Sequence, residues 1–554
     1  MKQIVKKYKI IFSIIILTLI TGLCFIYSME IRRGWLGELS TGDSKWRGGH
    51  HQWLSGSTLK FVNNWYFEGP LKLKFAFIEN PKSVEFKNLT ERKFYPSYPP
   101  GTIIPLYLLT KLLNHELTPS ILMKYNLINQ FFIAFFLSLS IFFFLRQINI
   151  NTTNSTLLSV IPIIIEYYTP ATMYWHQNVF FSDQAVIFPF VLFIFLEIIK
   201  SSIKNKRIIY ILQTIISFYG SLTDWFFTFV ILVIWFINIL KNKKNIIKTT
   251  LYYWTPYITA IGLFLIQLGI LGLLNKLYLK FLMRTGISQK GAKDIHDFFD
   301  QFWIQNIQNN YGTLYFYFII GSIFFLFFLL IFMKFKKDKF FSKILIFISY
   351  FIFPPLLQVY FLKNHSVVHD FSVLKFSPAL ATIPFVIIPI IIIYLFKIKH
   401  STFYNIKLHK ATFILPIIFC ITILHSTEYY TKLFPKPDLD LSKIGYFIKN
   451  NSSYKDIIFS DIYIIPENPP QRLSYSMKRI YKANNLKDIC KKIKSIKNNF
   501  IINFFTKQYK QNSNFIKTIN NNSFKKIKNN QFILYKIKKQ KIIQECKKSV
   551  IKLP

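Results

Sequence analysis

Apolar stretches long enough to cross a bilayer recur along the chain, and short lysine-rich segments separate them. A membrane-spanning helix needs about 20 mostly apolar residues. The stretches of roughly this length are 10–27, 122–145, 155–170, 184–200, 208–223, 224–240, 250–273, 313–333, 344–362, 378–396 and 411–426. The pattern predicts an all-α polytopic membrane domain over residues 1–426, with about eleven transmembrane helices.

Basic residues gather at alternate ends of these stretches, and this predicts an orientation in the membrane. Cytoplasmic loops carry an excess of Lys and Arg, and the first stretch follows a run of lysines, Lys2, Lys6, Lys7 and Lys9. The basic clusters expected on that same side are at 146, 200–207, 241–248, 334–343 and 397–410. We expect a multi-pass protein of the plasma (inner) membrane with a retained N-terminal anchor, a cytoplasmic N-terminus and an extracytoplasmic C-terminal domain.

Three segments on the predicted outer side are too long to be simple connections, and such loops often carry function. They are 28–121, 275–312 and 427–554. In the first, the apolar residues of HHQWLSGSTLKFVNNWYFEG recur at helical spacing: Leu54, Phe61, Val62 and Trp65. We expect a helix that lies flat in the membrane interface, with Lys60, Asn63 and Asn64 on its remaining surface.

The tail over 427–554 changes composition from Phe and Ile runs to Lys, Asn, Ser and Tyr. Strand-like runs such as DIIFSDIYII and FIINFF accompany a helical pattern in NLKDICKKIKSIK, and together they predict a small extracytoplasmic α/β domain. Cys490 and Cys546 both lie in this tail, where a disulfide and two spare thiols remain equal alternatives. Cys24 and Cys420 fall inside predicted spans, where cysteine packs as a small apolar residue.

The stretch YPSYPPGTIIPLYLL, Tyr95 to Leu109, interrupts this pattern with four prolines and a glycine. A residue that precedes proline is biased toward extended backbone, whereas Gly101 to Leu112 can form a helix. The stretch therefore predicts an extended turn followed by a helix of half the spanning length. Such a break is tolerated at membrane depth only where protein or water satisfies the backbone, which indicates the lining of a cavity.

Composition supports the assignment to the membrane. Hydrophobic residues make up 52% of the 554 positions, and 61 residues are Phe. The formal net charge of +44 does not indicate a nucleic-acid partner, because most lysines lie at the ends of apolar stretches or in the tail. No P-loop and no Gly-rich dinucleotide fingerprint occurs, which argues against nucleotide chemistry and ATP-driven transport.

Several of these features together resemble the polytopic glycosyltransferases of the GT-C fold. The resemblance is to the group that includes protein O-mannosyltransferases and aminoarabinose transferases. It rests on the anchor, the acidic outer loop, the box of Tyr98, Pro99, Pro100 and the aliphatic residues after Gly101, and the span that ends in LRQI. FFSDQAVIFPFVLFIFL, from Phe180, is similar to the group's aspartate-led later span, and the tail is similar to its outer C-terminal domains.

The resemblance implies inverting transfer of a sugar from a polyprenyl phosphate to a hydroxyl on the outer face of the membrane. A carboxylate of the first loop would activate the acceptor hydroxyl, and a general base must reach that proton. Asp43, in STGDSKWRGGHH, is our candidate, because it lies among Gly, Trp and His near the expected interface. Glu30 and Glu38 are the competing acids.

A lipid-phosphate leaving group requires cations and hydrogen-bond donors. The resemblance implies phosphate binding by Arg92 and Lys93 before the proline box and substrate binding by Tyr98, although the two basic residues would equally suit anchoring to anionic headgroups. His369 and Lys375, in KNHSVVHDFSVLKFS, form a second candidate cluster.

Asp183 and Asp224 each precede an apolar stretch, where an acid is either a helix cap or part of a site. We place Asp183 among the substrate-binding residues. His176, His365, His369 and Asp370 could supply metal ligands, but their spacing selects no metal. We therefore expect no metal or other cofactor, with a divalent metal as the open alternative.

The expected partners are a polyprenyl-phosphate-linked sugar, membrane lipids and a lipid, glycan or protein acceptor. Two other functions remain open on the sequence. A polysaccharide polymerase or ligase has a similar number of spans, although its large outer loop usually comes late in the chain. A transporter or flippase of lipid-linked glycans is expected to have internal repeats, and the sequence has none at that scale.

Overall fold

The computed structural model describes most of the chain. The described residues are 2–32, 52–83, 85–86, 88–203, 205–241, 243–287, 298–313, 316–317, 320–325, 327–328, 339–391, 394, 440–453, 455–461, 480–494, 496, 500–507, 513–528 and 532–551. They belong to two compact units. Unit 1 comprises Met1–Gly37, Ser97–Thr102 and Met123–Pro435, and unit 2 comprises Glu38–Pro96, Ile103–Leu122 and Lys436–Pro554.

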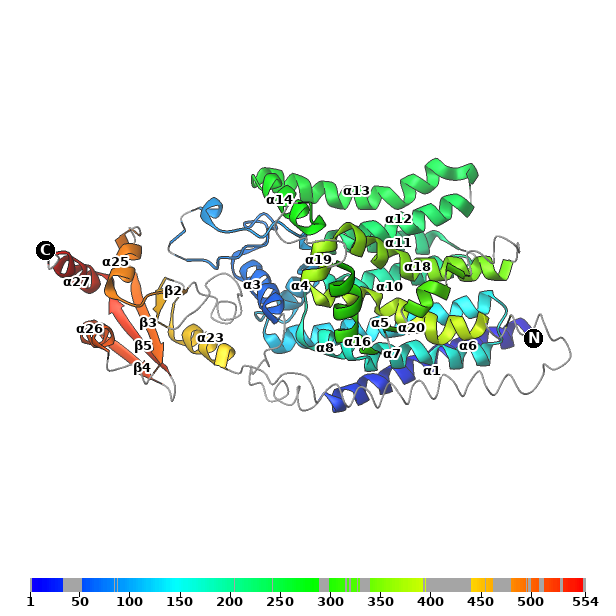
Figure 1. Cartoon of the computed structure of the whole chain (residues 1–554), viewed down its shortest axis with the longest axis horizontal. Coiled ribbons are helices and arrows are strands. Elements are labelled where there is room, and N and C mark those ends of the chain that lie inside the picture. The colour runs from blue at the N-terminus through cyan, green and yellow to red at the C-terminus, as the bar shows by residue number, and fades with distance from the viewer. Residues whose placement is uncertain are drawn as a thin grey trace. The chain divides into compact units, whose positions relative to one another are not determined.

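Unit 1 is helical throughout its described part (Figure 1). Its longer helices are α1 (Lys2–Ile31), α5 (Pro119–Gln147), α10 (Ile187–Ile199), α11 (Arg207–Thr223), α12 (Phe226–Lys241), α13 (Ile246–Ile270), α14 (Leu274–Thr285) and α18 (Lys339–Phe361). Its shorter helices are α6 (Thr152–Leu158), α7 (Val160–Tyr168), α8 (Pro170–Asn178), α9 (Ser182–Ala185), α16 (Ile307–Tyr311), α19 (Lys363–Val368) and α20 (Ser377–Thr382). Helices α11, α12 and α13 pack side by side (Figure 1).

Six segments among the described residues are long and apolar enough to cross a membrane. They are Tyr8–Ile31, Pro119–Gln147, Ser182–Ile199, Lys243–Ile270, Lys339–Phe361 and Asp370–Ile391. Large apolar side chains project from them, such as Leu19 and Leu23 of α1 and Ile258 and Ile266 of α13, each more than half exposed. An apolar surface of this kind suits lipid. The chain is thus a multi-pass membrane protein by its candidate spans, and the count of eleven stays a prediction.

A buried network of polar side chains surrounds Glu197 in unit 1. The Glu197 carboxylate accepts hydrogen bonds from Lys200 Nζ at 2.6 Å, Tyr253 Oη at 2.8 Å, Gln213 Nε2 at 2.9 Å and Asn238 Nδ2 at 3.0 Å. These partners come from α10, α11, α12 and α13 or directly adjoin them. A buried charge with complete partners fixes the relative positions of the elements that supply them, so this network holds four helices together.

The proline-rich stretch forms the structure expected from its sequence. A single 3₁₀ turn (Pro100–Thr102) precedes the short helix α4 (Ile104–Leu112), which has Pro105 in its first turn. A Cβ atom at Gly101 would lie 2.4 Å from the carbonyl oxygen of Leu222, near the end of α11. Only glycine permits this approach of two backbones, so Gly101 lets the box pack directly against the end of α11.

In unit 2, the predicted loop helix forms as α3 (Gln52–Glu68), and its expected apolar residues are buried. The expectation that Lys60, Asn63 and Asn64 lie on the surface is wrong, because all three are buried. Asn63 exchanges hydrogen bonds of 2.8 and 2.9 Å with the backbone of Leu117, and Asn64 Nδ2 donates to the carbonyl of Ile78 at 2.8 Å. Both amides satisfy loop backbone that would otherwise be buried without partners, which helical periodicity cannot reveal.

The C-terminal part of unit 2 is a small domain around a mixed five-stranded sheet of order β2-β1-β3-β5-β4. Its strands are β1 (Ile457–Ser460), β2 (Ile480–Lys482), β3 (Ile501–Lys507), β4 (Lys525–Lys528) and β5 (Phe532–Lys538), and its helices are α23 (Asp440–Asn451), α25 (Leu486–Lys494), α26 (Asn514–Asn522) and α27 (Lys539–Ile551). β1 pairs in parallel with β2 and β3, whereas β5 pairs antiparallel with β3 and β4. The predicted α/β tail is confirmed, and the boundary at 426/427 lies outside the described residues.

Alternate residues of the strands form two cores. One face, with Phe459 and Phe504, packs against α25, α26 and α27. The other face, with Ile458 and Phe505, packs against Ile448 of α23. This alternation is the pattern of a sheet covered on both faces.

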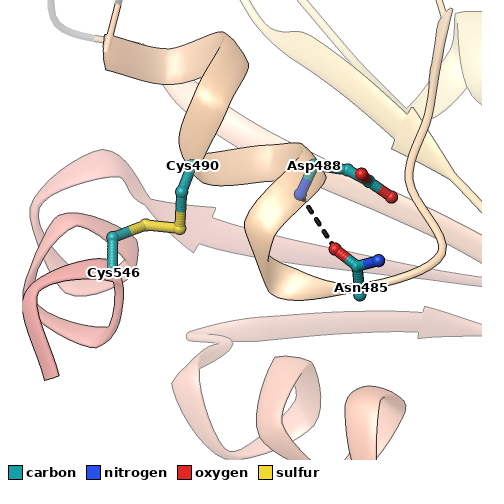
Figure 2. The surroundings of a disulfide bond; sticks show 4 residues. All are labelled: Asn485, Asp488, Cys490 and Cys546. Atoms are coloured by element: carbon teal, nitrogen blue, oxygen red, sulfur yellow. Dashed lines mark hydrogen bonds between the residues drawn. A yellow bond between two sulfur atoms is a disulfide. The ribbon is translucent and has the colours of Figure 1, made fainter. Parts of the chain in front are cut away.

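Cys490 of α25 and Cys546 of α27 form a disulfide, with a Cα–Cα distance of 5.8 Å (Figure 2). Asn485 opens α25, and its side-chain oxygen accepts a hydrogen bond from the backbone N–H of Asp488 at 3.0 Å (Figure 2). Of the two alternatives left open by the sequence, the structure contains the disulfide. Cys24 is a free, half-buried cysteine in α1, and Cys420 lies outside the described residues.

Replacing Cys490 and Cys546 by serine is expected to lower the opening free energy of the C-terminal domain by roughly 2–4 kcal/mol, because the disulfide closes a long loop and restricts the unfolded chain. Amide hydrogen exchange of the full chain in detergent measures this, and the amides of β3 and α25 are expected to exchange about 30- to 1,000-fold faster. The matched control, Cys24→Ser, removes a cysteine without a cross-link and is expected to leave these rates unchanged. Equal exchange rates with and without the disulfide would refute its stabilising role.

Candidate functional site

A buried ion pair lies at the centre of a polar cluster in unit 1. Lys375 Nζ is 2.5 Å from Asp183 Oδ1 and 3.6 Å from Asp224 Oδ1. The three side chains are at most 2% exposed. A lysine buried at this depth requires carboxylate partners, because an unpaired ammonium is costly away from water. Asp183 and Lys375 are 192 positions apart in sequence, yet their side chains are in contact.

Three breaks in helical structure bring these residues together. Asp183 lies in the first turn of α9, which follows extended backbone at Val179 and Phe181. Asp224 has extended backbone between α11 and α12, and its Oδ1 accepts a hydrogen bond from the N–H of Phe226 at 2.7 Å. Lys375 lies in a 3₁₀ segment, Asp370–Phe376. Asp224 therefore serves as a helix cap and faces Lys375 with the same oxygen.

His365, in α19, joins Asp183 to the proline box. Its Nε2 is 3.5 Å from Asp183 Oδ1 and 3.4 Å from the hydroxyl of Tyr98. Burial lowers the pKa of His365 below its ordinary value, and the neighbouring carboxylate of Asp183 opposes this shift only in part. The imidazole is therefore neutral at pH 7, and its single N–H can donate to only one acceptor.

Arg284, which stacks on the ring of Tyr98, is the second cation of the cluster. The guanidinium carbon of Arg284, at the end of α14, lies 4.2 Å from the centre of the Tyr98 ring. Arg284 Nη1 donates to the carbonyl of Ser97 at 3.2 Å, and Trp225 Nε1 donates to the same carbonyl at 2.9 Å. Cation–π stacking and these two hydrogen bonds fix the box against α11, α12 and α14.

The cluster combines carboxyl groups and cations with unused acceptor atoms. Asp183 and Asp224 supply the carboxyl groups, and Lys375 and Arg284 supply the cations. Burial raises the pKa of Asp224 above its ordinary value, and Lys375 opposes this shift. Asp183 Oδ2 and Asp224 Oδ2 accept no hydrogen bond from the described residues. A buried carboxylate oxygen without a donor is costly, so both atoms are suited to accept hydrogen bonds from the hydroxyls of a ligand. The guanidinium of Arg284 and the hydroxyl of Tyr98 are donors of the kind that binds phosphate.

The other residues proposed from the sequence are placed as follows. His369 is half-buried, and its ring centre lies 4.6 Å from that of His365. Arg92 and Lys93 are in unit 2, where Arg92 is forked onto Glu68 at 2.8 and 2.9 Å and Lys93 pairs with Glu79 at 2.8 Å. Asp43 lies outside the described residues. The structure thus brings Tyr98, Asp183 and Lys375 together, with His369 beside them.

Arg284 is the cluster residue that the sequence analysis missed. It is a single arginine in KFLMRTG, far from the proline box and from the acidic residues. No spacing or composition distinguishes it from a basic residue that ends a helix, where cations are common. His365 and Asp224 were recognised only as a possible metal ligand and a possible cap.

A separate buried pair in unit 1 bears on metal binding. His176 Nε2 is 3.6 Å from Glu166 Oε1, and His176 Nδ1 is 3.3 Å from Asn126 Oδ1. Within the described ranges no group of three or more His, Cys, Asp or Glu could hold a metal ion. Glu166 and His176 alone supply fewer ligands than the four of an ordinary zinc site, so these residues give no complete metal centre.

No protein-family model matches the sequence, and no curated protein matches it. Solved structures do match the fold. The oligosaccharyltransferase of Archaeoglobus fulgidus in its apo form matches with a TM-score of 0.54 at 8% identity, over 87% of this chain and 69% of that one. Its complex with an inhibitory peptide and a dolichol-phosphate matches with a TM-score of 0.53 at 9% identity, over 91% and 70%.

A second solved protein, ArnT of Cupriavidus metallidurans in the apo state, matches with a TM-score of 0.50 at 8% identity. This match covers 93% of the chain and 97% of ArnT. The fold is therefore that of the GT-C glycosyltransferases, at low sequence identity. A shared fold does not by itself establish a reaction.

Proposed function

We propose that this chain transfers a sugar from a polyprenyl-phosphate carrier to a hydroxyl group of a glycolipid, glycan or protein, with inversion at the anomeric carbon. One observation carries the proposal: Tyr98, Arg284, His365, Lys375 and Asp183 meet in a buried cluster of a GT-C-like helical unit. The cluster offers donors for a phosphate and acceptors for sugar hydroxyls within one set of contacts.

A lipid phosphate is the donor class best supported. The archaeal oligosaccharyltransferase has been solved with a dolichol-phosphate. In this chain, Arg284 and Tyr98 are suited to bind the phosphate, because a guanidinium and a hydroxyl both donate hydrogen bonds to its oxygens. Lys375 adds positive charge nearby. Asp183 contacts Lys375 and His365 directly, so in the proposal it positions both and offers Oδ2 to a sugar hydroxyl.

The proposed reaction is a single displacement. The acceptor oxygen forms a bond to the anomeric carbon while the bond from that carbon to the phosphate oxygen breaks, which inverts the configuration. The electron pair of the broken bond stays on the departing polyprenyl phosphate, whose negative charge Arg284 and Lys375 stabilise. Asp43 takes the proton of the acceptor hydroxyl as general base.

The proposed location is the plasma (inner) membrane, with the site and the C-terminal domain outside the cytoplasm. Basic clusters at the ends of the apolar stretches support this orientation. The disulfide supports it as well, because disulfides persist in oxidising compartments.

Purified chain in vesicles, supplied with a polyprenyl phosphate that carries a radiolabelled sugar, is expected to move the label to membrane or protein acceptors. The control reaction supplies the same sugar attached to a nucleotide, and no transfer is expected from this donor. Arg284→Gln is expected to raise the KM for the lipid-linked donor, because it removes the charged fork. Transfer from the nucleotide sugar, or no dependence on any prenyl-linked donor, would refute the proposal.

A further inference from the structure

Helix α14 exposes an apolar face that the proposed chemistry does not use. Leu274, Tyr278 and Phe281 are 47%, 58% and 52% exposed, and they lie on one side at helical spacing. Lys276 and Lys280, one turn apart, are exposed on the opposite side, where Leu279 is also exposed. The helix contains no acidic residue. An apolar aromatic face opposite a basic face is typical of a helix that lies in a membrane interface.

The position of α14 in the chain places it at the boundary of the bilayer. Three residues separate it from α13, whose last residue, Ile270, ends a candidate span. The connection turns at Gly272, which has a φ of +66°. Figure 1 shows α14 at the end of α13. So short a connection keeps the first residue of α14 within a few residues' length of the end of the spanning helix.

We propose that α14 lies on the membrane surface and binds the headgroups of anionic phospholipids. Its apolar face would enter the boundary between headgroups and acyl chains, and Lys276 and Lys280 would attract the anionic surface. Continuity with a spanning helix and a wholly basic charge both favour lipid over a protein partner as the occupant of this face.

The same helix reaches the candidate site, which gives the lipid contact a consequence. Arg284, in the last turn of α14, stacks on Tyr98 and donates to Ser97. The carbonyl of Met283 accepts a hydrogen bond from Asn364 at 2.7 Å, and Asn364 adjoins His365. A helix seated on headgroups therefore holds its C-terminal arginine against the proline box, and a helix lifted from the surface moves that arginine.

Spin labels on single cysteines test whether α14 lies on the membrane surface, and this test needs no substrate. The parent for these variants has Cys24 and Cys420 replaced by serine. One cysteine at a time is then introduced, labelled and reconstituted in vesicles: Leu274→Cys, Tyr278→Cys or Phe281→Cys. We expect these three labels to be accessible to oxygen and protected from a water-soluble nickel reagent. Labels at Lys276→Cys and Lys280→Cys are expected to show the reverse. The same accessibility at all five positions would refute the membrane-surface helix.

Varying the charge of the lipid tests whether α14 binds anionic headgroups. The label at position 278 is compared in vesicles of phosphatidylcholine alone and of phosphatidylcholine mixed with phosphatidylglycerol. We expect the label to insert more deeply with the anionic lipid. The double variant Lys276→Gln with Lys280→Gln is expected to reduce the ratio of membrane-bound to detached α14 by roughly 10- to 30-fold. The control, Lys243→Gln with Lys244→Gln at the opposite end of α13, is expected to keep the lipid response.

A depth that does not depend on lipid charge, or that the α14 double variant leaves unchanged, would refute the headgroup contact. Loss of the response in the control as well would show a general charge effect and would also refute it. These readouts measure position and not transfer. Their failure is therefore distinguishable from failure of the proposed function.

Discussion

Replacement of Lys375 by methionine is expected to destabilise unit 1 by roughly 3–5 kcal/mol and to abolish transfer, because it leaves two buried carboxylates without their shared cation. Methionine matches the length of the lysine stem, so the packing against Phe226, whose ring centre lies 5.3 Å from Nζ, changes little. Thermal unfolding of the purified chain in detergent, followed by circular dichroism, is expected to show a Tm lower by several degrees.

Two further variants separate the lost charge from a general effect of methionine. Lys375→Met combined with Asp183→Asn removes one buried charge of each sign, and the double variant is expected to regain stability relative to Lys375→Met alone. Lys339→Met, at an exposed position in α18, is expected to unfold at the temperature of the parent. A Lys375→Met chain as stable as the parent would show that the buried pair does not exist as described.

The sequence predicts those parts of the fold that repeat. Apolar stretches near 20 residues long predict candidate spans, and the short strand-like runs DIIFSDIYII and FIINFF predict the strands β1 and β3, because both signals follow from local geometry. The proline box was predictable for the same reason, since proline restricts its own φ and that of its neighbour. Local rules of this kind need no knowledge of what each element contacts.

The interior position of polar residues could not be predicted in this way. Asn63 and Asn64 are polar and were expected at the surface, but each satisfies the backbone of a loop residue that is distant in sequence. Lys375 was identified because a lipid phosphate requires cations and because it lies close to His369 in KNHSVVHDFSVLKFS. Arg284 was not, because an arginine at a helix end is common and its contact with Tyr98 depends on the tertiary fold.

The described cluster supplies binding groups for a phosphate and a sugar, but the acceptor hydroxyl also requires a base. Neutral His365 is held at 3.4–3.5 Å by Tyr98 and Asp183. Lys375 Nζ donates to Asp183 Oδ1 at 2.5 Å, so the pair holds its position in the cluster. The proposed base comes from the segment at and after the end of α1, where Asp43 is the first candidate and Glu38 and Glu30, the latter in the last turn of α1, are the competing acids.

Asp43→Asn is expected to lower the rate of sugar transfer roughly 10²- to 10⁴-fold, the usual contribution of a positioned general base. Asparagine keeps the shape of the side chain and loses the ability to accept a proton, so KM for the donor is expected to change little while kcat falls. The measurement is the initial rate of label transfer at saturating polyprenyl-linked donor. Glu30→Gln and Glu38→Gln are the matched controls, each expected to stay within a few-fold of the parent.

The pH dependence of the rate distinguishes a base from a residue that only shapes the loop. In the parent, the rate is expected to fall as the pH falls through the pKa of the base, because the protonated acid cannot accept the acceptor's proton. In Asp43→Asn the residual rate is expected to lose this acidic limb. Full activity in Asp43→Asn would exclude it as the base. A slow variant that keeps the acidic limb, with Glu38→Gln losing it instead, would assign the role to Glu38, since only the residue that takes the proton controls that limb.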